Sequence, residues 1–188
     1  MYFDSHAHYD DERFDDDRNE LLASFPDAGI ENVVNSSSDI ASSKASIALT
    51  EKYPFFYASV GVHPHEVEKM TEQDLLELET LSKHEKVVAI GEIGLDFYYD
   101  LSPRDMQRYW FKRQLELAER LDMPIIVHSR DAAQECFDII KASGVRKGVI
   151  HCYSGSAQMA KDYIDMGFYI GIGGSLTFKN NKKTVEVV

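Results

Sequence analysis

The sequence predicts an α/β protein of the TIM-type (β/α)8 barrel class, of which about seven strand–helix units fall within residues 1–188. Short apolar runs, several rich in valine and isoleucine, alternate along the chain with longer amphipathic and charged stretches. This repeated alternation with short turns is typical of parallel strands joined by crossover helices. In addition, residues of metal-binding type stand at the ends of several apolar runs, where barrels of this class carry their active sites.

Seven runs are expected to form the strands of the sheet. They are short, and several are apolar on both faces, as strands covered on both sides should be. In chain order they span Tyr2–Ser5, Ile30–Asn35, Phe55–Val62, Val87–Ile93, Ile125–His128, Gly148–Cys152 and Phe168–Ile172.

The stretches between these runs are expected to form helices, and four of them carry specific helix signals. A Thr-x-x-Asp sequence resembling a capping box opens the first, an apolar stripe marks the second, and a glycine follows each of the other two. The four expected helices span Thr71–Ser82, Arg104–Leu121, Asp131–Ala142 and Ser156–Met166.

The length of the chain limits how much of the barrel it can form. A typical barrel of this class takes about 250 residues, whereas this chain has 188. The last residues, Lys183–Val188, look like the start of a seventh helix with Val185 and Val188 on one face. We therefore expect residues 1–188 to form a single barrel domain that is incomplete at its C-terminal side, with strand 8 absent.

Composition and charge narrow the function classes. The formal net charge of −12 means that the overall field of the protein does not attract phosphate backbones. Cys136 and Cys152 are the only cysteines, which favours reduced thiols over a disulfide framework. The sequence shows neither a signal peptide nor an apolar run long enough to span a bilayer. We expect a cytoplasmic protein without a membrane partner.

Histidines and one glutamate at strand ends predict a metal site. His6 and His8 are two residues apart in a strand, so their side chains point to the same face and converge. Glu92, His128 and His151 end three further runs, and the C-terminal ends of parallel strands meet at one place. Imidazoles and a carboxylate that meet there are suited to binding metal ions. Glycines 91 and 94 flank the glutamate and indicate close approach of the backbone to a neighbour.

Other polar residues near these runs have more than one interpretation. His63 is either a substrate contact in the same cleft or a turn residue beside Pro64, and for His65 the turn role is favoured. Asp96 either orients a ligand histidine from behind or caps a loop. Arg130 either binds a phosphate through its two-pronged guanidinium or pairs with a neighbouring acid.

Taken together, the motifs resemble the TatD family of metal-dependent deoxyribonucleases, in the amidohydrolase superfamily. The resemblance implies a TIM barrel with two adjacent divalent metal ions, in which His6 and His8 bind the first, Glu92 bridges both, and His128 and His151 bind the second. Family members also carry an aspartate on strand 8 that has no counterpart in this chain. The motifs are Asp4-Ser5-His6-Ala7-His8, Gly61-Val62-His63-Pro64-His65, Gly91-Glu92-Ile93-Gly94-Leu95-Asp96, Val127-His128-Ser129-Arg130 and His151-Cys152-Tyr153-Ser154-Gly155.

The expected function is that of a divalent-metal-dependent deoxyribonuclease acting as a 3'-5' exonuclease on DNA, through water activated by two metal ions. Glu92 is the expected catalytic residue, and His63 and Arg130 are the expected substrate contacts. Mixed imidazole and carboxylate ligands suit Zn or Mn, while Mg prefers oxygen ligands, so all three metals stay open. Two alternatives also stay open. One is a metal-dependent amidohydrolase of a small amide, ester or lactone; the other is a truncated, catalytically inactive chain that binds metal.

Overall fold

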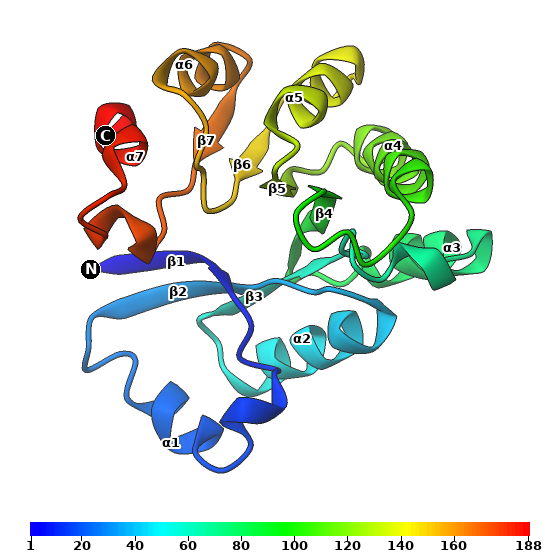
Figure 1. The fold of residues 1–188 in the computed structure, drawn as a ribbon. Coiled ribbons are helices and arrows are strands. Elements are labelled where there is room, and N and C mark those ends of the chain that lie inside the picture. The colour runs from blue at the N-terminus through cyan, green and yellow to red at the C-terminus, as the bar shows by residue number, and fades with distance from the viewer.

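The computed structural model describes residues 1–188 and confirms the predicted fold class. Seven parallel strands form one sheet whose spatial order equals the chain order. The sheet is curled into a half-barrel, and the helices lie on its outer side (Figure 1). The strands are β1 (Tyr2–Ala7), β2 (Ile30–Asn35), β3 (Phe56–Val60), β4 (Val87–Asp96), β5 (Ile125–Arg130), β6 (Gly148–Ile150) and β7 (Phe168–Ile170).

Helices follow the strands in the expected alternation, and α3 to α6 match the four that carry sequence signals. No helix of the chain combines the length and the apolar character needed to cross a membrane. Three short 3-10 turns cover Glu12–Phe14, Val67–Lys69 and Gly174–Thr177. The helices are α1 (Arg18–Ala23), α2 (Ile40–Lys52), α3 (Glu72–Leu81), α4 (Arg104–Arg120), α5 (Ala133–Ala142), α6 (Ala157–Asp165) and α7 (Lys182–Val187).

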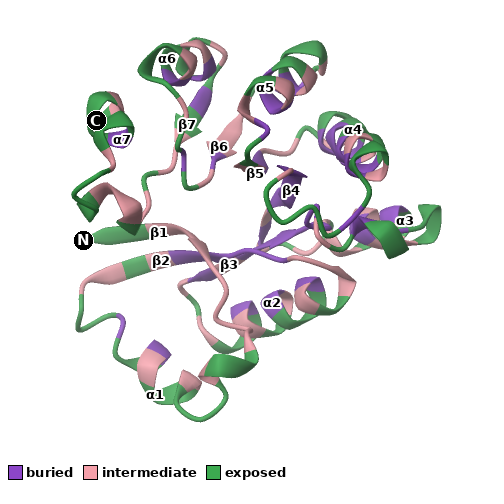
Figure 2. Cartoon of the chain, viewed as in Figure 1, coloured by how far each residue is buried: buried purple, intermediate pink, exposed green.

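The main hydrophobic core lies between the sheet and the helices around it. Buried residues occupy β2 to β4 and the helix sides that face the sheet, whereas the outer helix sides are exposed (Figure 2). Ile90, Phe111 and Ile125 belong to this core, and complete burial of such a side chain contributes about 1.5–3 kcal/mol. A separate small cluster contains Val34 and Ile126. The larger core is what holds the strands at the spacing that the site requires.

Helix α2 carries no apolar stripe, and this explains why no sequence signal points to it specifically. Its completely or almost completely buried residues are Ser43, Ser46 and Thr50. Small hydroxyl side chains let the helix approach the sheet closely while they hydrogen-bond locally. Asp39 caps its first turn, because its carboxylate accepts a hydrogen bond from the backbone N–H of Ser42.

The seventh helix is present as expected, and Val185 and Val188 lie on its exposed side. Val185 and Val188 are 60% and 78% exposed. Thr184 is buried instead, and Val187 packs against the main core. The reason is the start of the helix, where Asn181 accepts a hydrogen bond from the backbone N–H of Thr184 and so turns that side chain inward.

Two irregularities in the sheet lie where the candidate site residues stand. Across Asp4–Ala7, β1 advances three residues while β2 advances two. Across Ile90–Ile93, β4 likewise advances three residues against two of β5. Bulges of this kind redirect side chains and are frequent beside functional sites. The two bulges include His6 and Glu92. Because β4 continues to Asp96, Glu92 lies within the strand and not at its end, as the sequence had indicated.

Gly94 allows β4 to approach β5 closely beside the site. A Cβ atom on Gly94 would lie 1.9 Å from the carbonyl oxygen of His128, and the glycine has a φ of +147°. At Gly91 a Cβ atom would lie 2.7 Å from Cβ of Ile126. The close approach predicted from the two glycines is therefore an approach to β5, and it sets the distance between Glu92 and His128.

Candidate metal centre

Glu92 lies at the centre of a group of histidines, and its two carboxylate oxygens face different members. Oε2 lies 3.1 Å from Nε2 of His6 and 3.6 Å from Nε2 of His8. Oε1 lies 3.0 Å from Nδ1 of His128. The residue is only 3% exposed, so these nitrogens and not solvent surround the carboxylate. The arrangement suits a carboxylate shared between two cations.

His6 and His8 converge as their spacing predicts, with their Nε2 atoms 3.0 Å apart. Nδ1 of His8 lies 2.8 Å from the backbone carbonyl oxygen of Ser36. A carbonyl oxygen only accepts hydrogen bonds, so this nitrogen carries a proton. In the neutral ring the lone pair is then on Nε2, which faces Glu92. Nδ1 of His6 is held in a similar way, 3.1 Å from the hydroxyl oxygen of Ser36.

Asp96 fixes the ring of His128 from behind. Its Oδ2 lies 3.0 Å from Nε2 of His128 and 2.8 Å from Nε2 of His65. The ring of His128 therefore donates its Nε2–H to Asp96, and its Nδ1 faces Glu92. Oδ1 of Asp96 accepts hydrogen bonds from the backbone N–H groups of Tyr98 and Tyr99. Both roles left open for Asp96, orienting a histidine and capping the following loop, are thus present in the geometry.

The ring of His151, which lies just after β6, stacks on His6. The ring centroids are 3.4 Å apart with an angle of 15° between the planes. His6, Glu92 and His151 form one group whose ligand atoms all lie within 4.8 Å of one another. His63, His65 and His128 form the second such group. The structure thus brings all five expected ligands together, but it groups His151 with His6 and not with His128.

His63 and His65 both belong to this site. The turn role favoured for His65 is incomplete, because its ring donates to Asp96 and stands 4.3 Å from the ring of His63. Nδ1 of His63 accepts a hydrogen bond from the backbone N–H of His65. The neutral ring of His63 therefore carries its proton on Nε2, which lies 4.0 Å from Oε1 of Glu92. That tautomer suits His63 to donate a hydrogen bond into the cleft.

The site contains two charged carboxylates, Glu92 and Asp96, and two rings that burial keeps neutral, those of His63 and His151. Burial alone would raise the pKa of Glu92, but hydrogen bonds from His128, His6 and His8 outweigh it and hold the pKa well below its usual range. Burial lowers the pKa of His63 to about 3 and that of His151 to about 4. These two rings are neutral at physiological pH. Burial also lowers the pKa of His8 and His128, but hydrogen bonding to Glu92 raises it overall.

Arg130 ends β5 and does not form the ion pair with Asp131 that was one of its two interpretations. Its guanidinium carbon lies 4.2 Å from the ring centroid of Tyr98 and 4.6 Å from that of Tyr99. The sequence did not point to these two tyrosines. Their only signal was their position directly after Asp96, at the end of a strand that carries a site residue.

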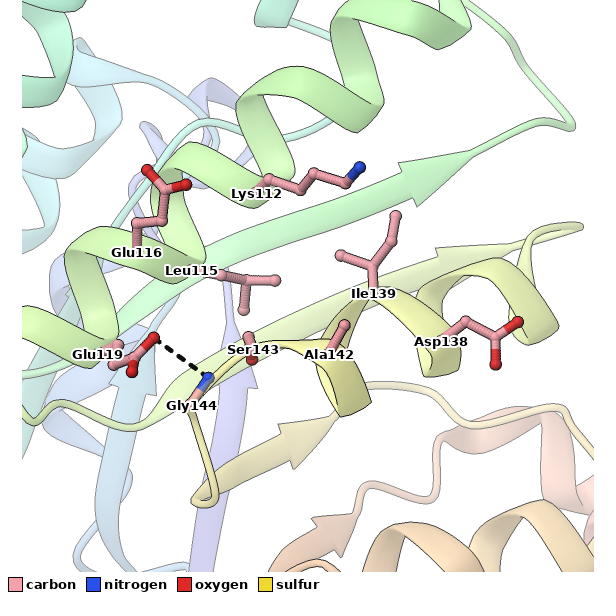
Figure 3. Close-up of a pocket in the computed structure, with 9 residues that line it drawn as sticks. All are labelled: Lys112, Leu115, Glu116, Glu119, Asp138, Ile139, Ala142, Ser143 and Gly144. Atoms are coloured by element: carbon pink, nitrogen blue, oxygen red, sulfur yellow. Dashed lines mark hydrogen bonds between the residues drawn. The ribbon is translucent and has the colours of Figure 1, made fainter.

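The cleft in front of the histidines has a volume of about 300 Å³ and no apolar residue in its lining. Figure 3 shows a larger depression of about 500 Å³ on the outer side of the barrel, between α4 and α5. There Glu119 accepts a hydrogen bond from the backbone N–H of Gly144. No histidine lines that depression. The candidate metal-binding residues therefore lie at the cleft and not in that depression. The cleft is lined by His8, Asp10, Asp11, Ser38, His63, His65, Glu66 and Glu92.

Comparison with known proteins agrees with this geometry. The family pattern described as TatD related DNase matches residues 3–188. The chain belongs to this family. This chain is 42% identical over 190 residues to the uncharacterized metal-dependent hydrolase YabD of Bacillus subtilis. The match covers all of this chain and 74% of YabD. The chain is 32% identical over 174 residues to the 3'-5' ssDNA/RNA exonuclease TatD of Cronobacter sakazakii, covering 92% of this chain and 66% of that protein.

Among solved structures, the TatD homologue YjjV of Escherichia coli superimposes with a TM-score of 0.92 at 34% sequence identity. The match covers 99% of this chain and 73% of YjjV. The corresponding part of YjjV therefore adopts the same half-barrel as this chain.

The side chains of the TatD family chain fit divalent metal ions. His6, His8 and His128 share one pattern: an outer oxygen holds one ring nitrogen, and the other nitrogen faces Glu92. Histidines that bind metal ions typically donate their second N–H to a carboxylate or a backbone carbonyl in this way. Without a metal ion these ring nitrogens carry protons that hydrogen-bond to Glu92, and a divalent cation bound between the rings and the carboxylate would take the place of those protons. The mixed nitrogen and oxygen donors do not select one metal.

Proposed function

We propose that this protein is a divalent-metal-dependent deoxyribonuclease that hydrolyses DNA phosphodiester bonds and removes nucleotides from the 3' end. The observation that carries the proposal is the position of Glu92, whose two oxygens face His6 and His128 at 3.1 and 3.0 Å. A carboxylate shared by two histidine groups suits a pair of metal ions, the arrangement that phosphoryl-transfer enzymes use. The polarity comes from the name of a relative, the 3'-5' ssDNA/RNA exonuclease TatD.

Five residues are proposed as metal ligands, with Glu92 shared between two ions. Bound divalent ions supply Lewis-acid activation of water and neutralise negative charge on the phosphate. Zn, Mn and Mg are all compatible with the proposal. The structure groups His151 with His6 and Glu92. A direct test therefore has to show which of the two ions His151 binds. The proposed ligands are His6, His8, Glu92, His128 and His151.

Glu92 is the proposed catalytic residue because it stays ionised while buried among imidazoles. Its lowered pKa keeps the carboxylate available at all physiological pH values. Asp96 contributes by holding the ring of His128 in one tautomer, with Nδ1 facing Glu92. This fixed geometry is the part of catalysis that the chain itself supplies, since no reorganisation is required when substrate arrives.

His63 and Arg130 are proposed to bind the phosphate. The Nε2–H of His63 faces the cleft, and a neutral donor suits a phosphoryl oxygen without competing for the metal ligands. Arg130 stands at the end of the strand that carries His128 and offers a planar pair of donors. The acidic net charge is compatible with this assignment, because only local cations and bound metal have to attract the substrate.

The proposal is tested with a single-stranded DNA oligonucleotide labelled in separate preparations at its 5' and 3' ends. With Mg, Mn or Zn present we expect mononucleotides to be released from the 3' end, and we expect EDTA to stop the reaction. His128→Ala should lose activity, whereas Arg146→Gln, at an exposed position in the loop before β6, should retain it.

Each contrary outcome has a distinct meaning. Bound metal without nucleotide release would favour a metal-binding chain without nuclease activity. Turnover of small lactones or esters in place of DNA would favour the amidohydrolase alternative. Release from the 5' end would retain the nuclease and overturn its polarity. Activity that survives the combined loss of His6 and His8 would overturn the ligand assignment.

A further inference from the structure

Two exposed tyrosines and one arginine form a surface beside the candidate metal centre. Tyr98 and Tyr99 follow β4 in the loop that leads to α4 (Figure 1). They are 58% and 53% exposed, and their rings stand edge to face with centroids 5.0 Å apart. Arg130 lies over both rings. Exposed aromatic rings beside a cation are the combination with which proteins hold single-stranded nucleic acid.

The backbone that carries the tyrosines is fixed at both ends of the loop. Oδ1 of Asp96 accepts hydrogen bonds from the backbone N–H of Tyr98 at 3.0 Å and of Tyr99 at 2.9 Å. At the other end, the side chain of Gln107 donates to the carbonyl oxygen of Ser102 at 2.8 Å. Both anchoring side chains are completely buried. The loop backbone is therefore held at both ends with the rings exposed, and such anchoring lowers the entropy cost of stacking a base on them.

Arg130 differs from the other arginines in having no partner for its guanidinium. Six of the eight arginines form ion pairs with carboxylates, and Arg146 donates to backbone carbonyl oxygens. The side chain of Arg130 makes no hydrogen bond and no ion pair in the structure; it only stacks on the tyrosines. In a chain with 32 acidic residues, a guanidinium with all of its donors free is suited to an anion supplied by a ligand.

The surface is continuous with the histidines of the centre. The ring of Tyr99 stands 5.6 Å from that of His65, and His65 shares Oδ2 of Asp96 with His128. The cleft lining, in contrast, includes the acidic residues Asp10, Asp11 and Glu66. A polyanion is repelled by those carboxylates and attracted by Arg130. The charges therefore favour an approach of the substrate strand over the tyrosines.

We propose that Tyr98, Tyr99 and Arg130 form a subsite that holds single-stranded nucleic acid, an inference that rests on the proposed nuclease function. Arg130 binds a backbone phosphate, and the free ring faces stack with bases next to the hydrolysed bond. A base can stack on a protein ring only when it has left its own helical stack. The subsite therefore selects single strands and frayed ends over intact duplex.

The test compares Tyr98→Leu/Tyr99→Leu and Arg130→Gln with wild type. Binding of a fluorescein-labelled dT10 oligonucleotide is measured by anisotropy in EDTA, and turnover is measured with metal present. The hydrogen bonds to Asp96 come from backbone N–H groups, so the leucine variant retains the loop anchor. Tyr109→Leu is the matched control, because Tyr109 is 50% exposed on α4 and hydrogen-bonds to Glu72.

The leucine variant should bind dT10 about ten- to a hundredfold more weakly, the range that base stacking supports. Its number of bound metal ions per chain should equal that of wild type, because neither tyrosine side chain is among the proposed metal ligands. Arg130→Gln should weaken binding and reduce the slope of log K against log salt by about 0.7, since one phosphate contact is lost. Tyr109→Leu should bind like wild type.

Failure of the subsite and failure of the proposed function are distinguishable. If the leucine variant binds dT10 like wild type while both hydrolyse it, the subsite is wrong and the nuclease stands. If wild type binds dT10 and the variant does not, but neither releases nucleotides, the subsite stands and the nuclease proposal is wrong. Absence of dT10 binding by wild type in EDTA overturns the subsite, whereas the nuclease proposal is decided by nucleotide release with metal present. An equal loss in Tyr109→Leu would show that the effect is not specific, and it too overturns the subsite.

Discussion

Glu92 and His128 face each other across the pairing of β4 with β5, with Oε1 of the glutamate 3.0 Å from Nδ1 of the histidine. The contact exists because the backbone of β4 bulges at Ile90–Ile93 and because Gly94 lets the two strands approach. It joins the two groups of histidines through one carboxylate. Most of the chemistry expected of this protein depends on that single shared side chain.

Glu92→Gln tests the shared carboxylate while preserving its shape. Loss of the charge removes an anionic ligand from both histidine groups, so we expect the number of metal ions per chain to fall from two to at most one. Activity should fall by at least about a hundredfold, because the loss of an outer partner of a ligand alone costs about 10- to 100-fold. Elemental analysis after dialysis and the oligonucleotide assay measure the two effects.

The control for this change is Glu85→Gln, which removes an exposed carboxylate outside the site. It should retain both ions and full activity. Retention of two ions by Glu92→Gln would contradict the bridging role and would leave the histidines as the only essential ligands.

Asp96→Asn tests the residue that positions His128, and it carries a pH signature. Burial alone would raise the pKa of Asp96, but hydrogen bonds from the Tyr99 backbone, His65 and His128 hold it at about 2, below the ordinary 3.8. Because the folded pKa is the lower one, the carboxylate contributes stability that is fully present above about pH 4 and is lost toward pH 2. The stability difference between wild type and Asp96→Asn should therefore narrow across that range.

Denaturant unfolding of metal-free protein at several pH values measures this difference, and metal titration measures the second effect. Asp96→Asn should weaken metal binding by about 10- to 100-fold, as changes to outer partners of metal ligands do. Asp122→Asn, at an exposed position, should show neither effect. A stability gap that does not depend on pH would contradict the role given to the Asp96 carboxylate.

Gly94→Ala tests the close approach of β4 to β5. Its added Cβ atom would meet the carbonyl oxygen of His128 at 1.9 Å, and the φ of +147° is unfavourable for alanine. We expect a loss of about 1–3 kcal/mol or more in the free energy of unfolding, with weaker metal binding because His128 is displaced. Gly174→Ala is the matched control, since a Cβ atom there meets nothing within 4 Å. Equal stability of the two variants would contradict the proposed reason for Gly94.

Much of the fold was predictable because its signals are local. Apolar runs and helix ends mark the strands and α3 to α6 directly, and β2 has the predicted bounds Ile30–Asn35. Helix α2 is not indicated by apolar periodicity, because its buried residues are Ser43, Ser46 and Thr50. The buried face of α7 is set by a hydrogen bond from Thr184 to Asn181, and spacing alone does not indicate it.

The candidate site was predictable as a set of residues and less so as a geometry. Strand ends point to the histidines and to Glu92, because parallel strands bring their ends together. The stacking of His151 on His6 depends on the curvature of the sheet, which no local pattern encodes. The part played by His65 depends on Asp96, 31 residues further along the chain. Such long-range pairs require the folded backbone before their partners can be named.

Asn35→Asp tests how the segment after His8 is held, and the pKa of its new carboxyl should shift in the opposite direction to that of Asp96. The buried side chain of Asn35 accepts from the backbone N–H of Tyr9 and donates to a carboxylate oxygen of Asp10 at 2.7 Å. An aspartate there loses the donor and sets two carboxylates against each other. We expect a loss of about 3–5 kcal/mol at pH 7, the cost of an uncompensated buried charge.

Repulsion and burial both raise the pKa of the new carboxyl in the folded state. The penalty is therefore present at high pH and is relieved as the pH falls below that raised pKa, so the variant should approach wild-type stability on acidification. Urea midpoints at pH 7 and pH 5 measure the recovery. Asn19→Asp, at an exposed position beside Lys52, should stay within about 0.5 kcal/mol of wild type at both pH values. A loss in Asn35→Asp that is equal at the two pH values would mean that the missing amide donor, and not the facing carboxylates, carries the cost.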